Sequence, residues 1–473
     1  MADESERKAR RSTQYLAALI VNLGALTIGT LLGWTGQAGP KLLAGETGVV
    51  PTETELSWMA GLMPLGAAFA ALPVPMLANF LGRKYTLLTA VAPLLLGFAL
   101  LAKAVDVEMY YAGRFVAGVG GGAFSIVAPQ YTAEIGEKSI RGALGSYYEF
   151  MLAVGVEFSY VVGGSVSVFW LSVISGVVPV VFAVLFFFMP ESPYYYAYKG
   201  DLERAKKSLG WLRGPEYDPT EELKEIRESS ERARKEKLSP SDFKTKAAVK
   251  SVEVAFWLMV FQQFSGANAV VFNTTSIFQA AGSELEPSQA SMIVGLMQFS
   301  GNFLSTLLVD RLGRRILLLS SGFLMGASTL LLGVYFHTVD RGQSVDYIKW
   351  LPMLSLCVFM IMFSVGWGPV AWMMLGELFP VKIKSVAGAF SCAVNWTATF
   401  LVTKFFPDLV ATFGRDVTFW VYTVISAIGF AFVYFGVPET KGKSLEEIQK
   451  ELSGEDNAAF CEETERPATA RVV

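Results

Sequence analysis

The sequence predicts an all-α membrane protein with twelve transmembrane helices, arranged as two six-helix bundles joined by a helical linker. Three observations lead to this fold class. The 473 residues are 52% hydrophobic and only 17% charged, with a mean hydropathy of +0.42, whereas soluble domains carry about a quarter charged residues. The charges are separated by apolar runs of about 20 residues, the length at which a helix spans the bilayer hydrocarbon. Several motifs also occur twice, once in each half of the chain.

Each apolar run is expected to form one transmembrane helix. Glycine is frequent inside these runs, as at Gly118 and Gly120, because small residues let bundled membrane helices approach closely. The twelve predicted spans are 14–36, 56–78, 85–104, 110–132, 143–165, 168–189, 252–280, 289–309, 316–337, 350–375, 386–410 and 417–437.

Charged segments divide the chain into five parts. We expect a cytoplasmic N-terminus (1–13), a first bundle (14–189), a cytoplasmic helical linker (190–250), a second bundle (251–437) and a cytoplasmic tail (438–473). Lys and Arg are concentrated in one set of connectors, and the positive-inside rule places that set, with both termini, in the cytoplasm. The linker mixes acidic and basic residues, as solvated helices supported by i,i+4 ion pairs do.

Charge, cysteine and histidine usage exclude several kinds of protein. The net charge of −3 argues against a nucleic-acid partner. Cys357, Cys392 and Cys461 are too few and too scattered for a disulfide framework. His337 is the single histidine, which disfavours histidine-based metal or acid–base chemistry. We therefore expect no metal and no cofactor. The first apolar run is long and many others follow, so no cleavable signal peptide is expected.

The duplicated motifs indicate two structurally parallel halves. A hydrophobic chain built from parallel repeats is typical of transporters, whose substrate site lies between the halves near the middle of the membrane. The repeated pairs are LGRK at 81–84 with LGRR at 312–315, EIGEKSIR at 134–141 with ELFPVKIK at 377–384, and PES at 190–192 with PET at 438–440.

Polar residues cluster in the seventh span, between Gln262 and Asn273. Sugars offer many hydroxyl groups and no charge, and side-chain amides both donate and accept hydrogen bonds. On an ideal helix Gln262 and Asn273 fall within an arc of about 80°, together with Ser265 and Ser276. Asn268 does not share that face, and we expect a break near Gly266 to turn it inward. The alternative is that these amides only join helices, but five polar residues in fifteen positions favour a site, because lipid penalises unsatisfied polar groups.

The motifs together resemble the sugar porters of the major facilitator superfamily along nearly the whole chain, and within them the arthropod facilitated trehalose and glucose transporters. This resemblance implies alternating access with a central sugar site, for which Gln298, Trp372 and Asn395 match wall positions. The matching motifs are GRF at 113–115, RG at 141–142, PESP at 190–193, QQFSGANAV at 262–270, DRLGRR at 310–315, NWT at 395–397 and PETKG at 438–442. The predicted substrate-binding residues are Gln262, Gln263, Asn268, Asn273, Gln298, Trp372, Asn395 and Glu149.

The charged motifs resemble a cytoplasmic gate of the family, whose members pair across the two halves when the inner side is closed. This sequence departs from the family's gate motif at residues that would weaken the gate. Asn79 stands where the family has an aspartate, and Lys384 replaces an arginine, whose planar guanidinium can form bidentate hydrogen bonds. Networks of ion pairs contribute more than isolated surface pairs, which supply only about 0–1 kcal/mol. The predicted gate residues are Arg83, Arg114, Glu134, Arg141, Glu191, Asp310, Arg314, Glu377, Lys384 and Glu439.

The sequence leaves the coupling to protons open. The first span contains no Asp or Glu, where proton symporters of the family carry an aspartate, and this favours facilitated diffusion. Against it, Glu149 and Glu157 lie within the fifth span, and an ionisable residue inside a membrane helix is a functional candidate by default. The expected function is facilitative transport of glucose or trehalose; the alternatives are a proton–sugar symporter using Glu149 or Glu157, and a sugar sensor that does not transport.

An enzyme is not expected, because the polar groups in the spans are amides without a nucleophile–base set. The predicted partners are a sugar and the lipid bilayer. We expect a functional monomer in the plasma membrane.

Overall fold

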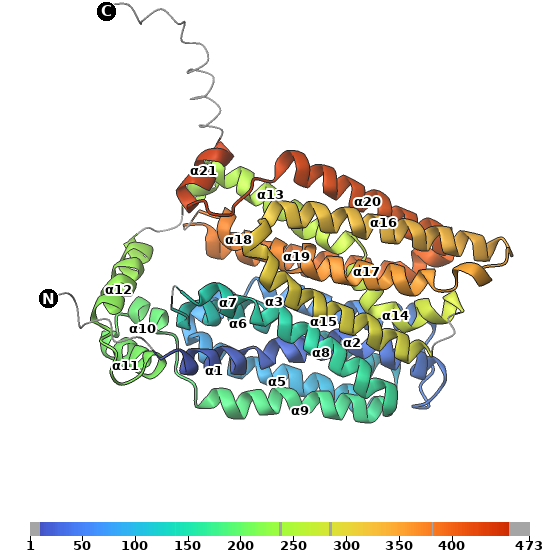
Figure 1. Cartoon of the computed structure of the whole chain (residues 1–473). Helices are drawn as coiled ribbons and strands as arrows, with labels where there is room; N and C mark the ends of the chain where they lie inside the picture. The colour runs from blue at the N-terminus through green and yellow to red at the C-terminus, as the bar shows by residue number, and fades with distance from the viewer. Residues whose placement is uncertain (1–9, 138, 236–238, 283–285, 381, 454–473) are drawn as a thin grey trace, which may run out of the picture.

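The computed structural model describes residues 10–137, 139–235, 239–282, 286–380 and 382–453. Within them the regular structure is entirely helical. Figure 1 shows the long helices lying side by side, with α10, α11 and α12 gathered at one end of the bundle, here called the linker end. The predicted fold class is confirmed.

The first half of the bundle contains six spanning units. α1 and α2 follow one another as a single apolar stretch, and α3 and α4 form a pair bent by 52°. α7 is a short helix directly before α8. The elements are α1 (Arg11–Val21), α2 (Leu23–Leu43), α3 (Glu53–Ala71), α4 (Val74–Leu81), α5 (Arg83–Ala102), α6 (Val107–Ile135), α7 (Arg141–Gly145), α8 (Tyr147–Ser165) and α9 (Val168–Phe187).

The second half repeats this arrangement, and two of its six spans are broken. α13 and α14 form one span with a break at Gly266, and α17 and α18 form another with a break at Gly366. The elements are α13 (Lys246–Phe264), α14 (Ala267–Ala281), α15 (Pro287–Leu312), α16 (Arg314–Asp340), η2 (Asp346–Ile348), α17 (Leu351–Val365), α18 (Trp367–Leu378), α19 (Lys384–Phe413) and α20 (Arg415–Gly436).

Length and hydropathy identify nine spans in the described part of the chain, or ten if the bent α3–α4 pair counts as one. α6 and α8 complete the twelve: they have 29 and 19 residues, but their glycines and charged residues lower the mean hydropathy. Burial separates central from peripheral spans. The apolar window of α1–α2 is 78% buried inside the protein, whereas those of α9 and α20 are only 33% buried and present apolar side chains outward, as lipid-facing helices do.

The linker between the halves is helical, as predicted. Its elements are α10 (Pro193–Lys199), α11 (Leu202–Arg213), α12 (Thr220–Lys235) and the 3-10 turn η1 (Pro240–Lys244). The linker is tied to the start of the first span, because the Arg10 amide donates to the Arg213 carbonyl at 2.7 Å. The final described helix, α21 (Leu445–Ser453), lies at the same end, where Gln449 donates to the Leu378 carbonyl at 2.5 Å.

Glycines set the spacing of the helices in the first half. A methyl group on Gly118 of α6 would lie only 2.1 Å from the Met63 carbonyl oxygen of α3. The same holds between α2 and α8, where a methyl group on Gly155 would lie 2.1 Å from the Leu26 carbonyl oxygen. The glycines inside the predicted spans therefore permit close backbone approach, as small residues do in membrane helix pairs.

Candidate functional site

The seventh span is broken at Gly266, where the sequence predicted the break. α13 ends at Phe264, and Gly266 adopts a left-handed conformation with φ of +93° as the residue before α14. A Cβ atom there would lie 2.9 Å from the ring of Tyr422, so both conformation and space require glycine. The break reorients the chain between Gln262 and Asn268, which an unbroken helix places on different faces.

Four predicted amides meet at this break in one hydrogen-bond network. Asn395 of α19 donates to Oε1 of Gln262 at 2.5 Å and accepts from Nε2 of Gln263 at 3.1 Å. Asn268 of α14 donates to Oε1 of Gln263 at 2.5 Å. Gln262, Gln263 and Asn395 are at most 5% exposed. Side chains from three helices thus form a connected polar cluster inside an apolar bundle.

Gln262 also connects the two broken spans. Its Nε2 donates to the carbonyl oxygens of Trp367 and Gly368, both at 2.8 Å, and these residues begin α18 directly after the break at Gly366. Its Oε1 accepts from Gln263 at 3.3 Å as well as from Asn395. A side-chain amide offers two donor hydrogens and two acceptor lone pairs, so Gln262 uses its complete hydrogen-bonding capacity within the protein.

The same count of donors and acceptors shows that Asn268 keeps hydrogen-bonding groups that could bind a ligand. Within the part of the chain that the structure describes, its Nδ2 makes one hydrogen bond, to Gln263, and the amide keeps a second N–H and a carbonyl oxygen. Gln263 donates twice and accepts once, which leaves one acceptor lone pair. Asn395 donates to Gln262 and to Sδ of Met259 and accepts once, so it keeps one acceptor lone pair as well. Among these four amides Asn268 therefore keeps both a donor and an acceptor, whereas Gln262 holds the network in place.

The other predicted substrate residues lie outside this network. Asn273 donates to the Ala269 carbonyl of its own helix at 2.9 Å. Gln298 of α15 is 6% exposed, and it makes no hydrogen bond to another described residue. Trp372 of α18 is half-buried, as is Glu149 of α8. Trp372 is five residues beyond Trp367, whose carbonyl accepts from Gln262.

Aromatic contact brings α8 of the first half against α15 of the second. The rings of Phe150 and Phe299 are 5.0 Å apart, and these residues directly follow Glu149 and Gln298 in the sequence. Glu149 and Gln298 therefore lie at the same level along α8 and α15 as this contact.

Three further contacts across the halves were not found from the sequence. The Tyr160 hydroxyl of α8 donates to the Val271 carbonyl of α14 at 2.7 Å. Nε1 of Trp396 in α19 donates to Oγ of Ser125 in α6 at 3.1 Å. Trp58 of α3 lies 6.0 Å from Phe400 of α19, measured between ring centroids. Sequence motifs gave no signal for these pairs, because their partners lie far apart along the chain.

The predicted gate residues of the first half form a compact charged cage at the linker end. Nη2 of Arg83 lies 2.7 Å from Oε1 of Glu134. Glu134 also accepts a short hydrogen bond from the Ser192 hydroxyl. Glu191 accepts from the backbone N–H groups of Arg83 at 3.1 Å, Lys84 at 3.0 Å and Ser192 at 2.7 Å. Two acidic side chains thus join the start of α5 to the end of α6 and the linker.

The second half repeats this cage almost bond for bond. Arg314 pairs with Glu377 at 3.0 Å, and the Thr440 hydroxyl donates to Glu377 at 2.5 Å. Glu439 accepts from the backbone N–H groups of Arg314, Arg315, Thr440 and Lys441 at 2.9 to 3.0 Å. The duplication read from the sequence therefore extends to individual hydrogen bonds.

The two cages differ in the electrostatics of their backbone-bound acids. Deep burial raises the pKa of Glu191 to about 7, although the N–H groups of Ser192 and Lys84 and the charge of Arg83 oppose the rise. The pKa of Glu439 lies below the ordinary value. Its partial burial raises the pKa, but hydrogen bonds from four backbone N–H groups lower it by more. The second cage also contains Asp310, which pairs with Arg314 at 3.3 Å; the matching position of the first half is Asn79.

The gate pairs of the described residues lie within one half rather than across the two. Arg141 donates to the Gly136 carbonyl at 3.3 Å, and Lys384 donates to the Gly376 carbonyl at 2.7 Å. Between the halves, the positive charges of Arg141 and Lys384 act on each other. In this structure the motifs therefore brace the ends of each half.

The structure does not bring Arg114 to the other gate residues. Arg114 and Glu134 lie in the same helix, about 30 Å apart at 1.5 Å per residue. The Arg114 side chain is completely buried and donates to the carbonyl oxygens of Leu31 at 2.7 Å and Met59 at 2.9 Å. Its guanidinium carbon lies 5.5 Å from the ring centroid of Trp34. Two carbonyls and an aromatic face stabilise its charge in the core of the first half.

Glu157 faces the seam between the halves. Its Oε2 is buried and makes no hydrogen bond among the described residues. A Cβ atom on Gly295 of α15 would lie 2.1 Å from this oxygen, so the carboxyl occupies the space that a side chain on residue 295 would need.

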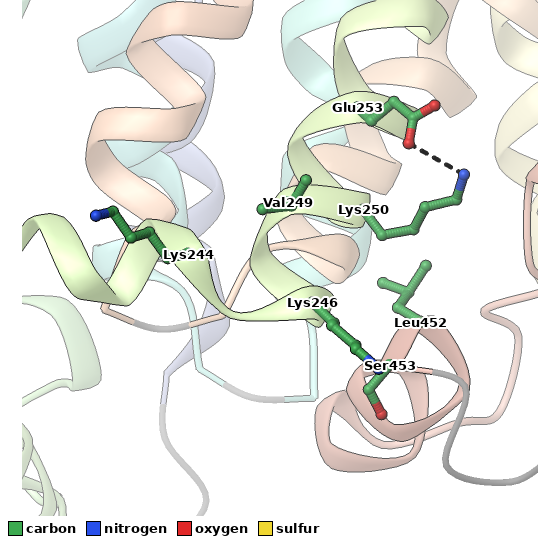
Figure 2. Close-up of a pocket in the computed structure, with 7 residues that line it drawn as sticks. All are labelled: Lys244, Lys246, Val249, Lys250, Glu253, Leu452 and Ser453. Atoms are coloured by element: carbon green, nitrogen blue, oxygen red, sulfur yellow. Dashed lines mark hydrogen bonds and ion pairs between the residues drawn. The ribbon is translucent and has the colours of Figure 1, made fainter. Parts of the chain in front are cut away.

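A surface hollow of about 330 Å³ lies at the linker end, away from the amide network. Figure 2 shows Lys246, Lys250 and Glu253 of α13 opposite Leu452 and Ser453 of α21, with Lys250 paired to Glu253. Three lysines line it.

Two halves with matching cages, broken helices and buried amides at the seam between them are the layout of a membrane transporter built from two repeats. The sequence matches the family described as sugar (and other) transporter over residues 5–452. The chain belongs to this family.

Curated relatives agree with this assignment, and a solved structure shares the fold. The chain is 38% identical over 448 residues to the facilitated trehalose transporter Tret1 of Polypedilum vanderplanki, covering 93% of this chain and 88% of that protein. It is 37% identical over 444 residues to Tret1 of Bombyx mori, and the match covers 93% of this chain and 87% of that protein. The xylose transporter XylE of E. coli, in a partially occluded inward-open conformation, matches with a TM-score of 0.78 at 22% identity, covering 92% of this chain and 100% of that one. The last match concerns the fold.

Proposed function

We propose that this sugar transporter carries trehalose or glucose down its concentration gradient by alternating access. The observation that carries the proposal is the amide network at the two helix breaks, because an uncharged polyol needs groups that both donate and accept. Asn268 keeps both a donor and an acceptor, Gln263 and Asn395 each keep one acceptor lone pair, and Gln262 fixes their positions. The names of the insect relatives support the choice of sugar.

Facilitated transport is also supported by the surroundings of Arg114. A buried arginine that pairs with a carboxylate forms a natural proton-linked switch, since protonation of the acid breaks the pair. Arg114 contacts two carbonyls and Trp34 instead. The whole of α1–α2, residues 11 to 43, contains no Asp or Glu.

The test is uptake of labelled trehalose and labelled glucose in oocytes, with and without a pH gradient. We expect saturable uptake that is independent of the gradient and does not accumulate sugar above the external concentration. Absence of uptake of both sugars would overturn the assignment of substrate.

Proton coupling is the second candidate, because Glu157 has a carboxyl oxygen at the seam with no hydrogen-bond partner among the described residues, and Glu149 lies beside the seam contact of Phe150. Acidification of the cell interior upon addition of sugar would favour it. Loss of that acidification in Glu149→Gln or Glu157→Gln would identify the residue.

The proposed gate consists of the two cages. Each cage holds the helix ends of one half together, so that the halves move as rigid units, and the repulsion between Arg141 and Lys384 favours separation at the linker end. We place the linker end in the cytoplasm, because the basic connectors gather there, and the protein in the plasma membrane as a monomer. Glu134→Gln and Glu377→Gln are each expected to slow transport.

A further inference from the structure

A lysine is buried inside a membrane span at the end opposite the linker. Lys404 of α19 is 5% exposed, and it lies about 30 Å from Lys384, at the linker end of the same helix. An ammonium group inside a span is costly unless it is paired. Asp408, one turn further along, supplies the pair, with its Oδ2 at 2.9 Å from Nζ of Lys404.

The Lys404 ammonium also contacts the other half of the protein. Nζ lies 5.2 Å from the ring centroid of Trp58 in α3, and 5.1 Å from that of Phe405 in its own helix. Tryptophan is the best aromatic partner for a cation, and the attraction is strongest when the cation is desolvated. The charge of Lys404 is therefore shared between an acid of its own half and an aromatic ring of the opposite half.

The packing around this contact allows little separation of the two helices. Trp58 lies 6.0 Å from Phe400 between ring centroids. A Cβ atom on Gly61 would lie 3.0 Å from the Phe400 ring and 3.1 Å from Cβ of Lys404, so glycine permits the close approach. Lys404 lies nine residues beyond Asn395, about 13 Å along the helix, and hence between the amide network and the outer surface.

We propose that Lys404, Asp408 and Trp58 form a lock that holds the outer side of the transporter closed. Lys404 and Asp408 move with the second half, and Trp58 moves with the first, so outward opening separates the ammonium from the ring. The lock then sets the balance between the outward-open and inward-open carrier. This inference rests on the alternating-access mechanism proposed above.

The main test compares Lys404→Met, which keeps most of the apolar stem but removes the charge, with Lys404→Arg, which keeps the cation. Sugar KM is measured for uptake and for efflux in proteoliposomes of known orientation. For Lys404→Met we expect KM for uptake to fall and KM for efflux to rise, with a combined change of about tenfold, which corresponds to about 1.4 kcal/mol. Lys404→Arg should stay close to the wild type. Lys250→Met, which removes a paired lysine at the linker end, is the matched control.

A second variant pair tests the contact itself. Trp58→Leu should shift both KM values in the same directions as Lys404→Met. The double variant should show no further shift, because both changes remove one interaction. Additive shifts, or a parallel rise of both KM values, would overturn the lock.

A readout without sugar separates failure of the lock from failure of the proposed substrate. Thr274 is completely buried beside Tyr160 on the outer side. The variant Thr274→Cys should react with an impermeant maleimide faster in the Lys404→Met background than in the Lys404→Arg background. Protein without the added cysteine gives the background rate. Equal rates in both backgrounds would refute the lock even if sugar transport is confirmed.

Discussion

Replacing Asn268 by alanine tests whether this amide contacts the sugar. Among residues 10–453 as far as they are described, Asn268 makes one hydrogen bond, to Gln263 at 2.5 Å, and keeps one N–H and one carbonyl oxygen. If both groups bind sugar hydroxyls at about 0.5–1.5 kcal/mol each, their loss costs about 1–3 kcal/mol. At about 1.4 kcal/mol per factor of ten, KM should rise roughly 5- to 150-fold.

Gln262→Leu serves as the contrast, because Gln262 is fully engaged within the protein. The change leaves the carbonyl oxygens of Trp367 and Gly368 without their donor, and each buried unpaired group costs about 1–3 kcal/mol. We therefore expect a lower melting temperature and poorer yield, with a smaller change in KM for the protein that folds.

The assay is initial uptake of labelled trehalose and glucose, combined with the melting temperature of the purified protein in detergent. Thr397→Ala is the matched control, since Thr397 is exposed and its hydroxyl donates to the Ala393 carbonyl of its own helix. The reasoning fails if Asn268→Ala leaves KM within twofold of the wild type, or if Gln262→Leu raises KM strongly at an unchanged melting temperature.

Three further predictions concern pH, packing and coupling. Burial raises the pKa of Glu191 from 4.5 to about 7. The stabilising contribution of the protonated Glu191 is therefore complete below pH 4.5 and is lost as the pH rises through 7. Glu191→Gln should flatten the pH dependence of the melting temperature across this window. Gly118→Ala places a methyl group 2.1 Å from a backbone oxygen and should destabilise by about 1–3 kcal/mol, whereas Gly142→Ala, with nothing within 4 Å, should not, as thermal melting will show. Glu149→Gln should leave the pH profile of uptake unchanged in a facilitative carrier, and a shifted profile would favour proton coupling.

Much of the fold was predictable because lipid imposes strict rules on sequence. Span length, the absence of charges within apolar runs and the repeated motifs identified an all-helical protein with two halves. The break at Gly266 was predictable as well, since Asn268 required a change of direction. The second break, at Gly366, was not predicted, because glycines are common inside membrane helices and do not by themselves indicate a break.

The sequence predicted the members of the amide network but not their roles. Gln262 and Asn268 have the same chemistry in a sequence, and only the hydrogen-bond count of the folded protein separates the saturated amide from the one with free groups. Likewise, the motif that contains Arg114 indicated a charged residue but not its depth in the membrane. The sequence analysis therefore assigned Arg114 to the gate, although Glu134 lies about 30 Å away along the same helix. Contacts such as Lys404 with Trp58 depend on tertiary structure and left no local signal.

The side chain of Gln262 has a mechanical consequence, because it bonds the end of α13 to the start of α18. A movement of either broken segment must stretch these bonds or carry the other segment with it. Two hinges in different spans are thereby coupled through one side chain. A shorter amide at residue 262 would not reach α18, and the two hinges would move independently. The coordination of the two hinges would then be lost under conditions in which the protein is still folded.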